Sequence, residues 1–251
     1  MRASGLVKRA VNGALAPFGA EIVRRQPHDF SDTRNFIPLE ETLARAAASG
    51  LSVGDYVDSL VKTPGATQAV IDQLSRLNVF QRPVDTLLEI GPGTGRYLVK
   101  IIAICRPRRV EIYETARPWA EYLAREHKVV MQPTDGHSLS ATPDRSCDLV
   151  QAFKVFSSIP SMPTMRYWAE MVRVCRPGGF IIFDIMTEDC LPPDCIQEWV
   201  SAGIENGAYP AAMPKAAALD YFASLGCELV GDFITPMELG STQTFVFKPT
   251  E

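Results

Sequence analysis

The sequence predicts an α/β fold in which a mostly parallel sheet carries helices on both faces, preceded by a helical extension. From residue 83 onward, short apolar runs alternate with amphipathic segments, a pattern typical of parallel strands joined by helices. At Thr86–Tyr97 (TLLEIGPGTGRY), an apolar run ends in closely spaced glycines, and apolar residues at helical spacing follow directly. A strand, a glycine turn and a helix in succession are typical of a ligand site, because glycine lets backbone amides approach a ligand closely.

The alternation continues to the end of the chain. The predicted strands span residues 84–90, 109–113, 128–131, 147–153, 180–185, 227–233 and 242–247. The predicted helices between them span residues 95–104, 118–127, 163–175 and 215–225. No helix separates the last two strands, so we expect them to form an antiparallel hairpin at the edge of the sheet.

Residues 1–80 predict a helical extension or lid, distinct from the sheet domain of residues 81–251. An apolar patch over 10–20 follows Lys8 and Arg9, and its spacing predicts an amphipathic helix packed on the protein. A peripheral membrane contact is the alternative that the basic residues fit. The chain has no apolar run long enough to span a bilayer, and we expect a cytoplasmic protein.

Further helices are expected between this patch and the sheet. Two short ones are predicted over 39–48 and 52–62. Gly50 supplies a stop for the first, and Ser52 an N-cap for the second. Thr63 and Pro64 are expected to begin another helix, as N-cap and first helical residue.

Composition limits the classes of partner. A net charge of -4 without a basic stripe argues against a nucleic-acid-binding protein. The hydrophobic content of 46% is ordinary for a globular protein. Six cysteines are scattered without a Cys-x-x-Cys motif, and only three histidines accompany them, which is a poor set of zinc ligands. We expect buried free thiols in a reducing cytosol.

Acidic residues distinguish this glycine turn from those of nicotinamide and flavin enzymes, which use a similar turn to bind pyrophosphate. Glu89 precedes the glycines, where it would repel a phosphate but would suit a cation. Glu114 ends the second predicted strand and can hold both hydroxyls of a ribose. Asp135 follows the third, where it can accept from an adenine amine. Three carboxylates at successive strand ends favour an adenosine-containing ligand with an ammonium group and no phosphate.

Several segments together resemble the class I S-adenosylmethionine-dependent methyltransferases. The motifs that carry the resemblance are LEIGPGTGRY (88–97), VEIYET (110–115), TDGHSL (134–139), SCDLVQAFKVF (146–156) and RVCRPGGFIIFDI (173–185). The resemblance covers residues 84–250 and implies a Rossmann-like seven-stranded sheet with an antiparallel last strand. It also implies S-adenosylmethionine as the cofactor.

The resemblance further implies which residues bind the cofactor. They are Glu89, Gly91, Gly93 and Gly95 around the methionine part, Glu114 and Thr115 at the ribose, Asp135 and Gly136 at the adenine, and Phe153 beneath the ligand. Trp119 lies on the helix after Glu114, near enough to cover the adenine. The alternative for this side chain is packing into the core.

Histidine is the natural general base near neutral pH, and His137 is our candidate because it lies two residues after Asp135. The alternative is a loop residue that hydrogen-bonds locally. His127 ends a helix, where an imidazolium suits the dipole, and His28 could serve only if its loop folds over the site. Relatives often carry a histidine or aromatic pair where this chain has Ser157 and Ser158, so no base is borrowed from there.

A Mg²⁺ ion is a further alternative that the spacing does not demand. Its candidate ligands are Asp135, Asp184, Glu188 or Asp189, together with His137. The acceptor pocket is expected to draw on residues 186–214, including Trp199 and Tyr209, and on the amino-terminal loop. For Glu188 and Asp189, a solvated loop is the other interpretation.

The amino-terminal run VKRAVNGALAPFGAEIVRR is similar to those before methyltransferase domains of bacterial, especially actinobacterial, glycan pathways. We therefore expect O-methylation of a sugar or glycan hydroxyl, with a small-molecule or glycan acceptor. The alternatives are methylation of a small amine, phenol or lipid head group, and a non-catalytic cofactor-binding module. A nucleic-acid partner is not expected, and the oligomeric state stays open, with a homodimer as one alternative.

Overall fold

The computed structural model describes residues 37–201, 211–237 and 240–250. The chain divides into two compact units, Met1–Asp32 and Thr33–Glu251, and every described residue lies in the second. The predicted amino-terminal helix, the loop that holds His28, and Tyr209 lie outside the described residues. Among the helices of the described parts, none is both long and apolar enough to cross a membrane.

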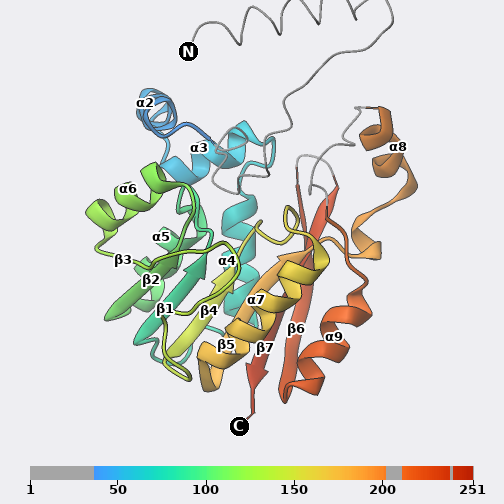
Figure 1. Cartoon of the computed structure of the whole chain (residues 1–251). Helices are drawn as coiled ribbons and strands as arrows, with labels where there is room; N and C mark the ends of the chain where they lie inside the picture. The colour runs from blue at the N-terminus through green and yellow to red at the C-terminus, as the bar shows by residue number, and fades with distance from the viewer. Residues whose placement is uncertain (1–36, 202–210, 238–239, 251) are drawn as a thin grey trace, which may run out of the picture. The chain divides into compact units, whose positions relative to one another are not determined.

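A single seven-stranded sheet organises this unit, in the order β3-β2-β1-β4-β5-β7-β6 (Figure 1). Its strands are β1 (Thr86–Ile90), β2 (Arg109–Tyr113), β3 (Val130–Met131), β4 (Cys147–Ala152), β5 (Cys175–Ile185), β6 (Cys227–Pro236) and β7 (Ser241–Pro249). The first five run parallel, and β7 is antiparallel to both β5 and β6. The predicted mostly parallel sheet with a reversed last strand is confirmed.

Helices cover both faces of the sheet, as predicted. They are α4 (Ala66–Arg76), α5 (Arg96–Cys105) and α6 (Arg117–His127) on one face, and α7 (Ser161–Val174) and α9 (Lys215–Ser224) on the other. Neighbouring strand residues point to opposite faces, so Leu87 packs with Leu98 of α5 while Leu88 packs in the cluster that contains Trp168 of α7. All six cysteines are free thiols, in agreement with the sequence.

The insertion after β5 packs against the hairpin of the last two strands. It contains the short 3₁₀ helix η3 (Glu188–Cys190) and α8 (Pro193–Ser201). Met186, Cys195 and Trp199 form a small apolar cluster of their own. A Cβ on Gly240 would lie 2.9 Å from the sulfur of Cys195, so the hairpin turn approaches α8 too closely for a larger residue. The insertion and the hairpin are thus one packed unit.

Helices α2 (Leu39–Ser49) and α3 (Val53–Leu60) form where the sequence predicts them. Gly50 ends α2 with a left-handed φ of 69°. The side chain of Ser52 accepts a hydrogen bond from the amide of Asp55 at 3.1 Å and so caps α3. Both local signals therefore operate as expected.

The predicted start of the next helix at Thr63 and Pro64 is wrong. Helix α4 begins at Ala66, after Gly65 in a left-handed conformation with φ 80°. The amide of Thr63 donates to the carbonyl of Asp58 at 2.8 Å, and its own carbonyl accepts from Ala66 at 3.0 Å. Thr63 is therefore occupied in a tight turn and does not cap the helix.

The cap of α4 comes from the side chain of Asp58 on the preceding helix. Its carboxylate accepts from the amide of Thr67 at 2.9 Å and from the Thr67 hydroxyl at 2.6 Å. The same carboxylate pairs with the Arg96 guanidinium at 2.9 Å. Asp58 is fully buried and Arg96 is 15% exposed, so one acid joins α3 and α4 to the first turn of α5.

We predict that Asp58→Ala lowers the free energy of unfolding by about 3–5 kcal/mol, because it removes the α4 cap and leaves the Arg96 charge without its partner. Urea denaturation measures this loss. The matched control is Asp55→Ala on the same helix, whose pair with Lys100 is exposed and should contribute about 1 kcal/mol or less. Equal losses in the two variants would contradict the assignment.

Candidate functional site

The glycine turn connects β1 to α5 and can be built only from glycines. Gly91, Gly93 and Gly95 all have left-handed φ values, of 58°, 54° and 78°. A Cβ on Gly91 would lie 2.7 Å from a methyl of Val155, and a Cβ on Gly95 would lie 2.5 Å from a methyl of Leu123. The turn therefore presents bare backbone at the carboxyl end of β1, as predicted.

Glu114 links the end of β2 to this turn. One of its carboxylate oxygens accepts from the amide of Gly93 at 2.7 Å, and the other accepts from the amide of Ala116 at 2.6 Å. Burial raises the pKa of Glu114, while these two amide hydrogen bonds and those from the amide and hydroxyl of Thr115 oppose the rise. The carboxylate therefore lies against the glycine turn as a hydrogen-bond acceptor.

Glu89 is 1% exposed and pairs in register with Gln151 of β4. The side-chain amide of Gln151 donates to Glu89 at 2.7 Å. Burial raises the pKa of Glu89 to about 8, the Gln151 hydrogen bond opposes this, and the charge of Glu114 adds to it. Glu89 is therefore a neutral acid near pH 7, a state that the sequence did not indicate.

Asp135 organises its own loop after β3. It accepts from the amides of His137 and Ser138 at 2.9 and 2.7 Å, and from the Ser138 hydroxyl at 2.6 Å. Partial burial raises the pKa of Asp135, but these hydrogen bonds outweigh the burial and bring the pKa down to about 2. Gly136, with φ 79°, lets the chain make the turn. The carboxylate is thus ionised and half-exposed.

His137 lies against the same acid. Its Nδ1 is 3.0 Å from the Asp135 carbonyl oxygen, and its Nε2 is 3.3 Å from the Asp135 carboxylate. The local hydrogen bonding expected in the second interpretation of His137 is therefore present. The ring is 44% exposed and is accessible from the carboxyl edge of the sheet.

Helix α7 holds the far end of this loop. Glu170 accepts from the amide of Leu139 at 2.9 Å, and Arg173 donates to the carbonyl of Leu139 at 3.0 Å. The two side chains also pair with each other at 2.8 Å. The loop that carries Asp135 and His137 is therefore anchored at Leu139.

The two predicted aromatic contacts have different surroundings. Phe153 follows β4 and stacks on Tyr97 of the first α5 turn, with ring centroids 4.4 Å apart. Trp119 is 1% exposed, and its indole N–H donates to the carbonyl of Ile37 at 2.7 Å. The structure thus places Trp119 in the packing of α6, which matches the alternative given for it.

Lys154 is a feature of the site that the sequence analysis missed. It follows Phe153 with a left-handed φ of 60°, and its ammonium lies 2.9 Å from the carboxylate of Asp184 on β5. The ammonium also reaches the hydroxyls of Thr235 and Thr242, next to the turn of the β6–β7 hairpin. The available signal was a lysine directly after an apolar strand. This network joins the end of β4 to the hairpin of β6 and β7.

The carboxylates proposed for Mg²⁺ have other partners. Asp184 is 1% exposed and bonded to Lys154, and Glu188 accepts from the amide of Lys215 at 2.8 Å. Within residues 37–201, 211–237 and 240–250, no group of three or more His, Cys, Asp or Glu side chains is arranged to hold a metal ion.

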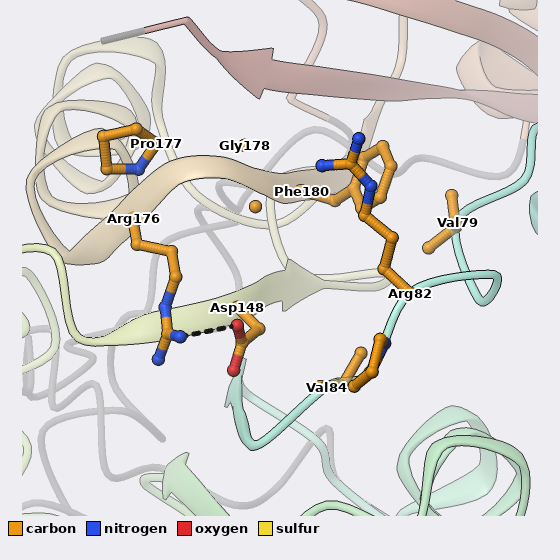
Figure 2. A pocket seen from close by; sticks show the side chains of 10 residues that line it. Val79, Arg82, Val84, Asp148, Arg176, Pro177, Gly178 and Phe180 are labelled. Atoms are coloured by element: carbon orange, nitrogen blue, oxygen red, sulfur yellow. Dashed lines mark ion pairs between the residues drawn. The ribbon is translucent and has the colours of Figure 1, made fainter.

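A hollow of about 260 Å³ lies at the amino-terminal ends of β1, β4 and β5 (Figure 2). Arg82 and Arg176 line it, and Arg176 pairs with Asp148 at 2.9 Å. Asp148 also accepts from the amides of Asp85 and Thr86, where β1 begins. Ligands of open α/β sheets bind outside the carboxyl ends of the strands, so this hollow is separate from the candidate site.

Comparison with known proteins supports the class of protein that the fold indicates. Residues 88–183 match the model of the family described as a methyltransferase domain. A dimethyladenosine transferase of Chaetomium thermophilum is 31% identical over 84 residues, which are 31% of this chain. The chain matches only 21% of that protein's length.

Two solved structures share the fold. N-methyltransferase NodS from Bradyrhizobium japonicum, in complex with S-adenosylhomocysteine, has a TM-score of 0.56 and 16% identity over 73% of this chain and 87% of its own. An O-methyltransferase family protein from Burkholderia thailandensis has a TM-score of 0.60 and 14% identity over 97% of this chain and 83% of its own.

The domain match, the fold and the strand-end carboxylates together support a class I S-adenosylmethionine-dependent methyltransferase. The residues present fit this cofactor, because three left-handed glycines form the turn at the carboxyl end of β1 and the Glu114 carboxylate lies against that turn at the Gly93 amide.

We predict that Glu114→Ala weakens S-adenosylhomocysteine binding by about 10- to 150-fold, since a hydrogen bond to a charged group contributes about 1.5–3 kcal/mol. Isothermal titration calorimetry measures the affinity. Glu121→Ala on the neighbouring helix removes an exposed carboxylate that pairs with Arg117 and should leave the affinity unchanged. Unchanged affinity in Glu114→Ala, with its fold intact, would show that the ribose assignment is wrong.

Proposed function

We propose that this chain transfers a methyl group from S-adenosylmethionine to a hydroxyl of a sugar or glycan. The observation that carries the methyl-donor part is the convergence of Glu89, Glu114 and the glycine turn at one edge of the sheet. The backbone of Gly91, Gly93 and Gly95 would hold the methionine part. Glu114 and Thr115 would hold the ribose.

The adenine would lie beside the loop of Asp135 and Gly136. Oδ1 of Asp135 already accepts from the amides of His137 and Ser138, and Oδ2 accepts from the Ser138 hydroxyl, so the second lone pair of Oδ2 would accept from the adenine amine. Phe153 would lie under the ligand, supported by its stack on Tyr97. Trp119 would then support α6 and leave the adenine face to other residues.

When bound, the cofactor supplies a methyl group on a positively charged sulfur. The protein's part is to align the acceptor oxygen with that methyl, and alignment alone can contribute about 7–11 kcal/mol. A hydroxyl also has to lose a proton, and a positioned base typically contributes about 10²–10⁴-fold. His137 is our proposed base: one ring nitrogen would turn from its Asp135 contact to take the acceptor proton, while Asp135 orients the ring through the other.

The glycan assignment rests on the amino-terminal run and on the need for a base. The similarity to the Burkholderia thailandensis O-methyltransferase family protein extends over nearly the whole chain and supports a hydroxyl acceptor. A small amine is the second candidate, because the similarly folded NodS is an N-methyltransferase. Such an acceptor would need alignment but no base. The acceptor would be bound by residues 186–214 and the hairpin turn, and we propose a cytoplasmic location.

We predict methyl transfer to mono- or oligosaccharides in a screen with radiolabelled S-adenosylmethionine. Amines, phenols and lipid head groups form the comparison pools, and a parallel reaction in EDTA tests the metal alternative. Transfer to amines alone would contradict the glycan assignment. Tight cofactor binding without transfer to any pool would favour a non-catalytic module.

The acceptors that are methylated in this screen then serve to test His137 as the general base. His137→Ala should lower kcat by about 10²–10⁴-fold while leaving the affinity for S-adenosylhomocysteine within about threefold. His127→Ala, at the end of α6, is the matched control and should keep full turnover. Equal losses of turnover and cofactor affinity in His137→Ala would assign His137 to the cofactor loop instead.

A further inference from the structure

We propose that Glu89 holds a proton in the cofactor-free protein and releases it to solvent when the ammonium group of the cofactor binds beside the glycine turn. Cofactor binding is then coupled to the loss of a proton, and Glu89 recognises the cation by becoming a carboxylate. This inference rests on the proposed cofactor and deepens it.

Among the described residues, the groups that act on Glu89 include no cation. Gln151 of β4 is neutral, and the other acidic group that acts on Glu89 is Glu114 of the β2 end, which disfavours a second negative charge. The cations of this region are already paired, Arg96 with Asp58 and Lys154 with Asp184. A buried carboxylate without a cation is costly, so the neutral acid is the stable form.

An independent observation comes from Gln151. Its side-chain carbonyl oxygen is buried and has no hydrogen-bond partner among the described residues. A protonated Glu89 carries an O–H that can donate to this oxygen, while the amide of Gln151 donates to the other Glu89 oxygen at 2.7 Å. A carboxylate has no such donor. The reciprocal acid–amide pair therefore satisfies a group that the ionised form would leave unsatisfied.

The position of Glu89 makes it responsive to the ligand. It lies two residues before Gly91, on the strand that leads into the turn. A cation within about 4–6 Å lowers the pKa of a carboxyl by about 1–3 units. Binding of an ammonium group converts Glu89–H into Glu89 carboxylate plus a solvent proton, while the ligand keeps its own charge. An ion pair replaces a neutral acid.

The proposal predicts that the affinity for the ligand increases with pH. Burial raises the pKa of Glu89 to about 8 in the free protein, so below this pH binding must displace a proton. Affinity for S-adenosylhomocysteine should rise by about 5- to 50-fold in total between about pH 6 and 8, where the ligand's amine is still largely protonated. The Glu89→Gln variant keeps the amide pair but has no proton to release, so its affinity should not follow this slope.

Isothermal titration calorimetry in buffers of different ionisation enthalpy measures how many protons are released when the ligand binds. At about pH 7 we expect wild-type protein to release about 0.5–1 proton per bound S-adenosylhomocysteine, and Glu89→Gln to release none. Glu114→Gln is a second variant, because burial also raises the pKa of Glu114. The proton release should persist in this variant if the proton comes from Glu89. A wild-type release below about 0.1 proton, or equal release in Glu89→Gln, would overturn the proposal.

Thermal unfolding without ligand gives a second measurement. An acid whose pKa is raised by folding stabilises the fold fully below its unfolded value near 4.5, and this contribution is lost as the pH rises towards about 8. The melting temperature should therefore fall more between pH 5 and 8 in wild type than in Glu89→Gln, and parallel curves would overturn the proposal. If S-adenosylhomocysteine fails to bind, the proposed function fails; if it binds without proton release, only this inference fails.

Discussion

The glycine turn between β1 and α5 is the constraint on which the rest of the site depends. Its first amide, from Gly91, donates to the carbonyl of Tyr113 on β2 at 2.8 Å, and its second glycine, Gly93, is held by Glu114. Side-chain methyls of Val155 and Leu123 fill the space where Cβ atoms would lie. The turn is therefore fixed from β2, from the residues after β4 and from α6, before any ligand arrives.

Two acids behind this turn are neutralised in different ways. Asp184 is buried with a lysine, and the Lys154 ammonium that neutralises it also joins the hairpin of β6 and β7 to the end of β4. Glu89 is buried with an amide alone and stays uncharged until a cation arrives. The first arrangement gives a permanent framework between the end of β4 and the hairpin of β6 and β7. The second leaves a carboxyl group that can respond to the charge of the cofactor.

Most of the sheet could be predicted from the sequence, because the spacing of apolar residues and the positions of glycines indicate strands and turns within a few residues of the chain. The prediction failed where a distant side chain replaces a local signal, as when Asp58 caps α4 in place of Thr63. It also missed the pairing of Lys154 and the neutral state of Glu89, whose hydrogen-bond partner Gln151 lies 62 residues away. Such features depend on strand register and burial, and both exist only after the chain has folded.

Competition binding tests the central claim most directly, namely that the strand-end carboxylates form a site for a cationic, phosphate-free nucleoside. The account predicts that S-adenosylhomocysteine binds and that excess NAD⁺ or ADP-ribose fails to displace it, because Glu89 and Glu114 disfavour a pyrophosphate beside the glycine turn. Displacement by either dinucleotide-type ligand, at concentrations comparable with S-adenosylhomocysteine, would contradict it.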